Sequence, residues 1–340
     1  MMKQLLAHCI EGNTLSEGQA EQVMNEIMSG HATPSQIASL VSIMRLRGET
    51  VDELVGFARS MKKHMVSIEY PHSVVDTCGT GGDGASTFNI STAAAIVTSS
   101  LGVKVAKHGN RAVSSSSGSA DVLEKLGLSI QISQEEAIKS LNEQNMSFLF
   151  APMFHSSMKH AVNPRKEIGF RTVFNLLGPL SNPANAKRQV IGVFSTDYAE
   201  KMAEALKRLG SEHVLLVTGK DGLDEISIST ETDIVELKNG EISRYILHPK
   251  DVGLFTSNQE GLLVKNAEES AKLIEEIFNG KGPESAENIV AINAGAALYV
   301  ANYVQTIEMG VLLAKETIQN GKALQQLKDL RSYQREENYA

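Results

Sequence analysis

The spacing of apolar residues divides the chain into a helical beginning and a longer part in which strands and helices alternate. Between residues 1 and 65, apolar side chains recur every three or four positions, which is typical of amphipathic helices. Ser16, Thr33-Pro34 and Thr50 are typical helix starts, and Gly30 is a typical stop. Four short helices are therefore predicted. They carry no obvious chemistry, so we interpret them as a scaffold whose apolar faces are able to bury a partner subunit.

After residue 71, short apolar runs alternate with helical periodicity. Strands are predicted to end at Val74-Val75 and to cover 103–107, 147–151, 189–194 and 213–218, with helices at 133–145 and 197–209. Asn239-Gly240 indicates a hairpin within 226–246, and helical periodicity returns at 266–279, 285–302 and 306–335. This alternation is typical of a mainly parallel sheet with helices on both faces.

The predicted fold class is therefore α/β, with a small all-helical N-terminal domain and a larger α/β domain that has a mainly parallel central sheet and flanking helices. We place the helical domain at 1–70, joined by helices from about 155–185, and the α/β domain at 71–340. A chain of 340 residues is long for a single domain, which agrees with this division.

Composition excludes several classes of protein. With 42% hydrophobic and 21% charged residues the chain resembles ordinary globular proteins, and its net charge of −8 gives no field that attracts nucleic acid. Two cysteines provide no disulfide framework, so we expect a cytoplasmic protein. No apolar run reaches the ~20 residues of a membrane span, and no signal segment is evident at the N-terminus, so no membrane association is expected.

The most informative stretch is a glycine-rich loop. Asp76-Thr77-Cys78-Gly79-Thr80-Gly81-Gly82-Asp83-Gly84 follows the first predicted strand, and Phe88-Asn89-Ile90-Ser91-Thr92 leads into an Ala-rich helix. Such a loop lets backbone N–H groups approach a ligand, and the helix N-terminus favours an anion. Asp83 would repel a phosphate unless a sugar hydroxyl or a metal lies between them. The pattern predicts a phosphorylated sugar with a divalent cation, and an ordinary tight turn is the alternative.

Two further loops follow predicted strands. One contains Lys107-His108-Gly109-Asn110-Arg111, four serines at 114–117 and Ser119. In an open α/β sheet, ligands lie at the carboxyl ends of the strands, so this loop and the glycine loop are expected to face one crevice. The other, Asp221-Gly222-Leu223-Asp224-Glu225, is either a solvated turn or a cation site.

These segments, together with Phe170-Arg171-Thr172-Val173-Phe174-Asn175-Leu176-Leu177-Gly178-Pro179-Leu180-Ser181-Asn182-Pro183, resemble the motifs of the anthranilate phosphoribosyltransferases. The resemblance extends in order along nearly the whole chain. It implies transfer of the 5-phosphoribosyl group from phosphoribosyl pyrophosphate to the amine of anthranilate, giving N-(5-phosphoribosyl)anthranilate and pyrophosphate in tryptophan biosynthesis. It also implies Mg²⁺ as cofactor and a homodimer formed through the helical part.

The resemblance assigns roles to individual residues. The residues implied to bind phosphoribosyl pyrophosphate are Gly79, Gly82, Asp83, Thr87, Asn89, Ile90, Ser91, Thr92, Lys107, His108, Gly109, Asn110, Arg111, Ala112, Val113, Ser114, Ser115 and Ser119. Those for anthranilate are Gly79, Asn110 and Arg165, and those for the metal are Ser91, Asp224 and Glu225. A guanidinium such as that of Arg165 is a natural partner for a benzoate carboxylate.

Some interpretations stay open at this stage. No catalytic residue is certain: His108 either accepts a proton after the bond forms or only supports its loop. Cys78 is interpreted as a packed residue rather than a nucleophile. Two other functions are weighed against the transferase: a related nucleoside phosphorylase, disfavoured by the Asp224-Glu225 pair, and a nucleic-acid-binding protein, disfavoured by the lack of a basic surface.

Overall fold

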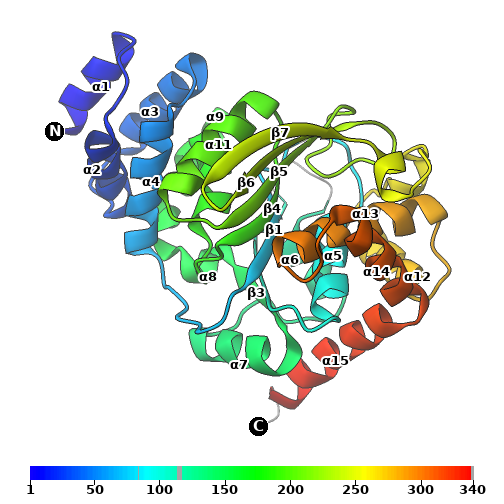
Figure 1. Ribbon diagram of the computed structural model, residues 1–340. Coiled ribbons are helices and arrows are strands. Elements are labelled where there is room, and N and C mark those ends of the chain that lie inside the picture. Colours follow the sequence, from blue (N-terminus) through cyan, green and yellow to red (C-terminus); the bar gives the residue numbers. More distant parts are fainter. Residues whose placement is uncertain (83, 113–116, 338–340) are drawn as a thin grey trace.

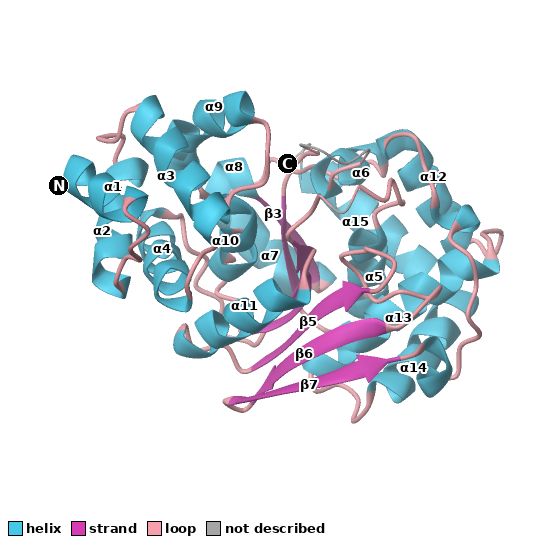
Figure 2. Ribbon diagram, turned by 90° about the horizontal axis from the view of Figure 1, so that it is seen from above, coloured by secondary structure: helices cyan, strands magenta, loops and turns pink. Residues whose placement is uncertain are grey.

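The computed structural model describes residues 1–82, 84–112 and 117–337 and contains one sheet between two groups of helices. Figure 2 shows α1–α4, α9 and α10 on one side of the sheet and α5, α13 and α14 on the other. The N-terminal group comprises α1 (Met2–Ile10), α2 (Glu17–Met28), α3 (Pro34–Arg47) and α4 (Val51–His64), with α8 (Ala151–Phe154), α9 (Lys159–Ile168) and α10 (Val173–Leu177) from later in the chain. Helices α9 and α10 pack against α2, α3 and α4.

The remaining elements build the α/β part. They are β1 (Val75–Gly79), α5 (Ile90–Ser99), β2 (Val105–Gly109), α6 (Ser119–Lys125), α7 (Gln134–Gln144), β3 (Met146–Phe150), β4 (Arg188–Gly192), α11 (Thr196–Arg208), β5 (His213–Gly219), β6 (Thr232–Lys238), β7 (Glu241–Leu247), α12 (Ala267–Phe278), α13 (Glu284–Val300), α14 (Ile307–Gln319) and α15 (Lys322–Glu337). In Figure 1 the N-terminal helices and the C-terminal α15 lie at opposite ends of the molecule.

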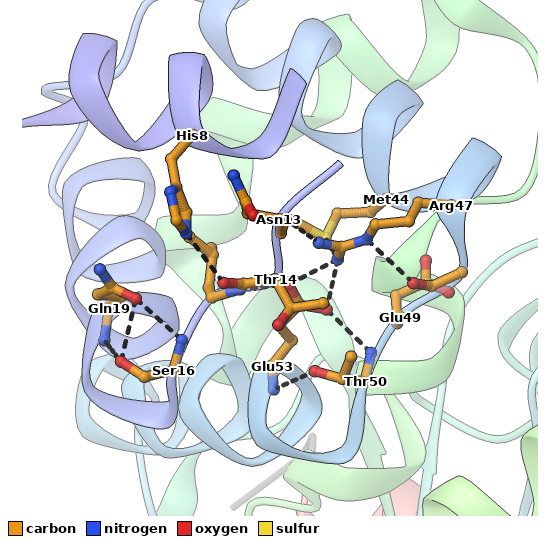
Figure 3. Close-up of polar contacts among 12 residues, drawn as sticks. His8, Asn13, Thr14, Ser16, Gln19, Met44, Arg47, Glu49, Thr50 and Glu53 are labelled. Carbon is orange, nitrogen blue, oxygen red and sulfur yellow. Dashed lines mark hydrogen bonds and ion pairs between the residues drawn. The ribbon is translucent and has the colours of Figure 1, made fainter. Parts of the chain in front are cut away.

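The helix starts predicted in the N-terminal group are confirmed. The side chains of Ser16, Thr33 and Thr50 each accept a hydrogen bond from the backbone N–H three residues on, and the residue there returns the bond. The wholly buried Glu53 accepts hydrogen bonds from the N–H groups of Leu15 and Thr50 at 2.9 Å and pairs with Arg47 at 2.6 Å (Figure 3). One carboxylate thus joins the start of α2, the end of α3 and the start of α4.

The sheet has the order β3-β2-β1-β4-β5-β6-β7. The first five strands in this order, β3, β2, β1, β4 and β5, are parallel to one another. Strands β6 and β7 are added by antiparallel pairing, so the predicted mainly parallel sheet is confirmed. Asn239 and Gly240, with φ of 52° and 83°, form the predicted hairpin between β6 and β7. The chain builds β1, β2 and β3 outward in one direction and then returns to place β4 on the other side of β1. The order therefore reverses between β1 and β4, where α/β proteins bind ligands.

Both faces of the sheet are buried, as the sequence predicts. Leu215 and Val217 of β5 pack into the cluster that contains α5 and α13, whereas Val214 and Leu216 pack into the cluster that contains α4 and α11. Alternate side chains of a strand point to opposite faces, which explains this division. Because the second cluster continues into the N-terminal helices, the helical group and the sheet share one core.

Several predicted elements differ from the structure in their bounds. Strand β1 begins at Val75 instead of ending there, because the polar Asp76 and Thr77 are buried strand residues. Strand β2 begins two residues later than predicted and runs to Gly109. The predicted helix 306–335 is two helices, since Gly321, with φ of 82°, interrupts it between α14 and α15. The domain limits 1–70 and 71–340 stay a prediction.

Within the described residues, none of the helices is both long enough and apolar enough to cross a membrane.

Candidate active site

Four parallel strands end in a glycine, and other parts of the chain pass close to these ends. The glycines are Gly79, Gly109, Gly192 and Gly219. A Cβ atom on Gly192 would lie 1.6 Å from the carbonyl oxygen of Asp224, and one on Gly79 would lie 2.8 Å from its carboxylate. The segment around Asp224 therefore crosses the carboxyl ends of β1 and β4, where the strand order reverses.

The glycine loop is held from two directions. Gly81 and Gly82 have φ of 68° and 80°, which favour glycine, and the Gly81 N–H donates a 2.9 Å hydrogen bond to the Asp224 carboxylate. On the other side, a Cβ on Gly82 would lie 2.9 Å from the Nε atom of Arg171, whose guanidinium lies 4.7 Å from the centre of the Phe194 ring. Sequence reasoning gave Arg171 no separate role. Asp83, assigned above to the phosphoribosyl donor, lies outside the described residues.

Asn89 connects the glycine loop with the second loop. It caps α5 by accepting the N–H of Thr92 at 3.1 Å, and the same side-chain oxygen accepts the hydroxyls of Ser91 and Ser119 at 3.4 Å each. Ser119 begins α6, so the two loops predicted to face one crevice do meet in the structure. Thr87, just before the cap, pairs with Leu263 across an isolated bridge.

Lys107 places an ammonium group beneath these loops. It is 1% exposed and donates to the Thr77 carbonyl and, at 3.0 Å, to the Ser91 hydroxyl. Burial lowers the pKa of Lys107, and the nearby charges of Asp76 and Glu225 oppose this shift. Lys107, Ser91 and Glu225 are consequently neighbours in the folded chain, although they come from three separate segments.

Asp76 is a structural residue that sequence reasoning did not single out. It is fully buried and accepts hydrogen bonds from the His108 N–H at 3.0 Å and the Asn182 amide at 2.8 Å. Burial raises the pKa of Asp76, and these bonds together with the charge of Lys107 oppose the shift. A carboxylate within a buried apolar run needs such partners, which is the signal that could have found it.

His108 packs against a second histidine. Its ring centre lies 5.1 Å from that of His155, and burial lowers the pKa of His108 to about 3 and that of His155 to about 4. Both rings are therefore neutral near pH 7. The His155 ring is hydrogen-bonded to the Ser181 carbonyl. A proton acceptor with so low a pKa is weak, which favours the supporting role for His108.

The described part of the second loop is organised by acidic residues. Arg111 donates to Asp121 at 2.8 Å and to Glu124 at 2.6 and 2.7 Å, and the Ala112 N–H donates to Asp121 at 2.9 Å. The guanidinium of Arg111 is thus paired with carboxylates, and its role toward phosphate stays a prediction. Asn110 accepts the Arg111 N–H. Val113, Ser114 and Ser115 lie outside the described residues.

Several buried polar atoms around the crevice have no hydrogen-bond partner among the described residues. They are the hydroxyls of Thr80, Thr92 and Ser117 and the Nε2 atom of His108. Such atoms are nearly always satisfied in folded proteins. These four atoms lie on the two loops and on the adjoining strand and helix. A polar ligand bound in the crevice would supply the hydrogen bonds that they lack.

The side chains of Asp224 and Glu225 suit a magnesium ion whose other coordination positions are filled by water and by phosphate oxygens of a ligand. Both side chains are half-buried at the strand ends, Asp224 against the glycine loop and Glu225 near Lys107. Across the described ranges, no group of three or more His, Cys, Asp or Glu side chains is arranged to hold a metal. Mg²⁺ commonly takes one or two protein carboxylates and fills its other positions with water and substrate phosphates, so a pair suffices.

Arg165 lies on the helical side of the crevice. It is half-buried on α9, its guanidinium stands 5.1 Å from the centre of the Phe174 ring, and burial lowers its pKa. No acidic partner for it occurs in the described part of the chain. The next residue of α10, Asn175, donates to the Thr80 carbonyl at 3.3 Å, so the helix beneath Arg165 contacts the glycine loop.

The mainly parallel sheet, with the glycine loop at its switch point, and the attached helical bundle correspond to the two domains of a class of glycosyl-transferring enzymes. The family models agree: the α/β domain of a glycosyl transferase family matches residues 71–324, and the helical bundle domain of the same family matches residues 3–65. Within this class, the chain belongs to the anthranilate phosphoribosyltransferase family.

The relatives are similar over their whole length. Anthranilate phosphoribosyltransferases of Geobacillus kaustophilus and Bacillus licheniformis are 63% and 54% identical, and the matches cover 98% and 100% of both chains. The crystal structure of the enzyme from Thermus thermophilus has a TM-score of 0.91 at 39% identity, covering 97% of this chain and 99% of the other. That of Saccharomyces cerevisiae, in complex with phosphoribosyl pyrophosphate and Mg, has a TM-score of 0.87 at 27% identity, covering 98% of both.

Proposed function

We propose that this protein transfers the 5-phosphoribosyl group of phosphoribosyl pyrophosphate to the amine of anthranilate, in tryptophan biosynthesis, with Mg²⁺ as cofactor. The observation that carries the proposal is the meeting of Lys107, the start of α5 and the Asp224-Glu225 pair at the switch point of the sheet. The names of the full-length relatives support it. The nucleoside phosphorylase and nucleic-acid alternatives have no comparable support.

The residues that meet there suit a diphosphate. The backbone N–H groups of the glycine loop and of the first turn of α5 offer donors, and Ser91, Thr92 and Ser119 offer hydroxyls. Lys107 adds a positive charge beneath them. We therefore place the donor between the glycine loop and the second loop, with Asn89 fixing the distance between the two.

The reaction needs little help for the nucleophile. An aromatic amine is neutral near pH 7 and able to attack an activated anomeric carbon, so a strong general base is not required. The amine nitrogen forms a bond to that carbon, the bond to pyrophosphate breaks, and the amine loses one proton. The demanding part is the charge that develops on pyrophosphate, which Lys107 and backbone N–H groups stabilise in a water-poor site. When bound at Asp224, Glu225 and Ser91, Mg²⁺ supplies further neutralisation of this charge.

Arg165 is proposed to bind the anthranilate carboxylate, with Asn110 and Gly79 near the same substrate. Replacing Arg165 by alanine is expected to raise the KM for anthranilate by about 10- to 100-fold, the loss of a charge-assisted hydrogen bond, with a much smaller change for phosphoribosyl pyrophosphate. Steady-state kinetics with each substrate varied in turn measures both values. Arg208→Ala, which removes a surface arginine from α11, is the control. A larger change for the donor would move Arg165 to the phosphate side.

His108 is proposed to support its loop without carrying a proton in the reaction. Because its pKa of about 3 lies far below that of a free histidine, the ring is neutral from pH 6 to 8 in the native enzyme. His108→Ala should accordingly keep kcat within about tenfold of the native value and leave the pH dependence of kcat unchanged across this range. Loss of a limb of the pH profile in the variant would instead assign proton transfer to His108.

The quaternary state and compartment belong to the proposal as well. Exposed apolar side chains occur on several helices of the N-terminal group, namely Ile10, Leu46, Met153 and Val162. We propose a homodimer formed through the helical part, in which a second copy would bury such apolar side chains. Both cysteines, Cys9 and Cys78, are free thiols, which suits the cytoplasm.

The direct test is to mix the purified protein with anthranilate, phosphoribosyl pyrophosphate and Mg²⁺ and to follow the loss of anthranilate fluorescence. Loss that requires all three components is the expected result. Omission of each component in turn is the control. No loss from folded protein would overturn the proposal, and nucleosides with inorganic phosphate would be the next substrates to test.

A further inference from the structure

Asp221 lies just before the Asp224-Glu225 pair in the same loop. It is the centre of a hydrogen-bond network that the site described above does not include. Its Oδ2 atom accepts hydrogen bonds from the hydroxyls of Ser227 and Ser229 and, at 2.7 Å, from the side-chain amide of Gln259. Its Oδ1 atom accepts the Leu223 N–H at 3.3 Å. One carboxylate therefore joins both ends of the segment 221–229, which carries the proposed metal ligands.

This segment is fixed against the rest of the fold on two further sides. A Cβ on Gly219 would lie 2.4 Å from the Asp221 carboxylate and 3.2 Å from the Leu223 carbonyl oxygen, so a glycine at the end of β5 lets the turn pack closely. Asn293 of α13, which is 2% exposed, accepts the Ile226 N–H and donates to the Ile226 carbonyl, both at 3.0 Å. The backbone directly after Glu225 is thus held by a buried amide.

Gln259 extends the network toward residues 86–88, which lead into α5. It belongs to a strap, defined here as residues 253–264, whose Ser257 N–H donates to the Ile228 carbonyl at 3.0 Å. Further along, the Phe88 N–H donates to the Leu262 carbonyl at 2.8 Å, and the strap's Val264 N–H donates to the Ser86 carbonyl at 2.9 Å. The strap therefore bonds the metal segment at one end and the approach to α5 at the other.

We propose that Asp221 is a positioning residue for the magnesium site and that its bond to Gln259 couples the metal segment, through the strap, to residues 86–88, which lead into α5. This inference rests on the proposed function, because it takes Asp224 and Glu225 as the magnesium ligands. Asp221 reaches the metal only through the backbone that it orders. Removal of a residue that holds metal ligands in place typically weakens metal binding by about 10- to 100-fold.

Asp221→Asn is the principal variant. The amide keeps the shape of the side chain but places an NH₂ group among three hydrogen-bond donors, so the network cannot form as it stands. We expect the Kd for Mn²⁺, titrated by electron paramagnetic resonance in the presence of phosphoribosyl pyrophosphate and without anthranilate, to rise by about 10- to 100-fold. The KM for anthranilate should stay within about twofold of the native value, since Arg165 lies on the helical side.

Asp233→Asn is the matched control. This carboxylate on the adjacent strand β6 also accepts hydrogen bonds from a hydroxyl, that of Thr196 at 2.8 Å, and from a nitrogen donor, that of Lys220 at 2.6 Å, and both partners lie outside the strap. Its removal should leave the Mn²⁺ affinity unchanged. If Asp221 only stabilised the fold, Asp221→Asn would lower the melting temperature without changing the Mn²⁺ affinity, and that result would overturn the proposal.

Gln259→Ala tests the coupling separately. We expect hydrogen exchange at the amides of Phe88 and Val264 to become about tenfold faster, because the strap loses its attachment to Asp221. The double variant Asp221→Asn with Gln259→Ala should then weaken Mn²⁺ binding by less than the product of the two single effects. Unchanged exchange together with independent effects of the two variants would overturn the coupling.

The same Mn²⁺ titration distinguishes failure of the positioning role of Asp221 from failure of the proposed metal site. Asp224→Asn with Glu225→Gln should abolish most of the Mn²⁺ binding. If that variant binds Mn²⁺ as the native protein does, the metal assignment fails and the role of Asp221 fails with it. If that variant loses binding while Asp221→Asn binds normally, only the positioning role is overturned.

Discussion

Replacement of Lys107 by glutamine is expected to lower kcat by about 10²- to 10³-fold, the range measured when a group that stabilises developing charge is removed. The ammonium of Lys107 is buried, fixed by the Thr77 carbonyl and the Ser91 hydroxyl, and needs no reorganisation when pyrophosphate departs. Single-turnover measurement of phosphoribosylanthranilate formation reports the loss directly.

Lys104→Gln is the control for this prediction. Lys104 stands just before the same strand and bonds the Asn142 carbonyl and the Asn145 side chain, away from the crevice. Circular dichroism should show that both variants fold. A folded Lys107→Gln protein with kcat within threefold of the native value would remove Lys107 from the stabilisation of the leaving group.

Exchange of both carboxylates, in Asp224→Asn with Glu225→Gln, is expected to lower the rate at 1 mM Mg²⁺ by at least about 10²-fold, as loss of a metal that stabilises several kcal/mol of developing charge requires. Part of the rate should return at higher Mg²⁺ concentration, since the donor's own phosphates still bind the ion. A titration of rate against Mg²⁺ concentration measures both effects.

The control is Glu231→Gln with Asp233→Asn, which removes two negative charges at β6, outside the crevice. It should keep the native magnesium dependence. If the Asp224-Glu225 variant had native kinetics, the assignment of these two residues as metal ligands would be wrong.

Local rules predicted much of the fold because they concern neighbouring residues. Caps at Ser16, Thr33 and Thr50, the Asn239-Gly240 hairpin and the alternation of strands and helices all follow from short-range chemistry. The predicted end of the first strand at Val74-Val75 was wrong for the opposite reason. Asp76 and Thr77 are polar residues inside a buried strand, and only their partners on other segments, such as Asn182, make that tolerable.

The same distinction applies to the candidate site. The glycine loop and the acidic pair are visible as motifs in the sequence. The packing of His155 on His108 and the close approach of Arg171 to Gly82 join residues that are far apart in the chain. No periodicity encodes such contacts. The network of Asp221 is intermediate, because the serines are local but Gln259 is not.

The burial of α5 has a consequence for the thermodynamics of donor binding. Nine of its ten residues are buried, and it packs against α13, β1 and β2. The N-terminus of α5, which we propose to bind the donor's phosphates, is consequently immobilised when the protein folds, so little conformational entropy remains to be lost when the donor binds. Calorimetry of phosphoribosyl pyrophosphate binding should then give a favourable enthalpy and only a small change in heat capacity, because the wall of the site buries no new apolar surface.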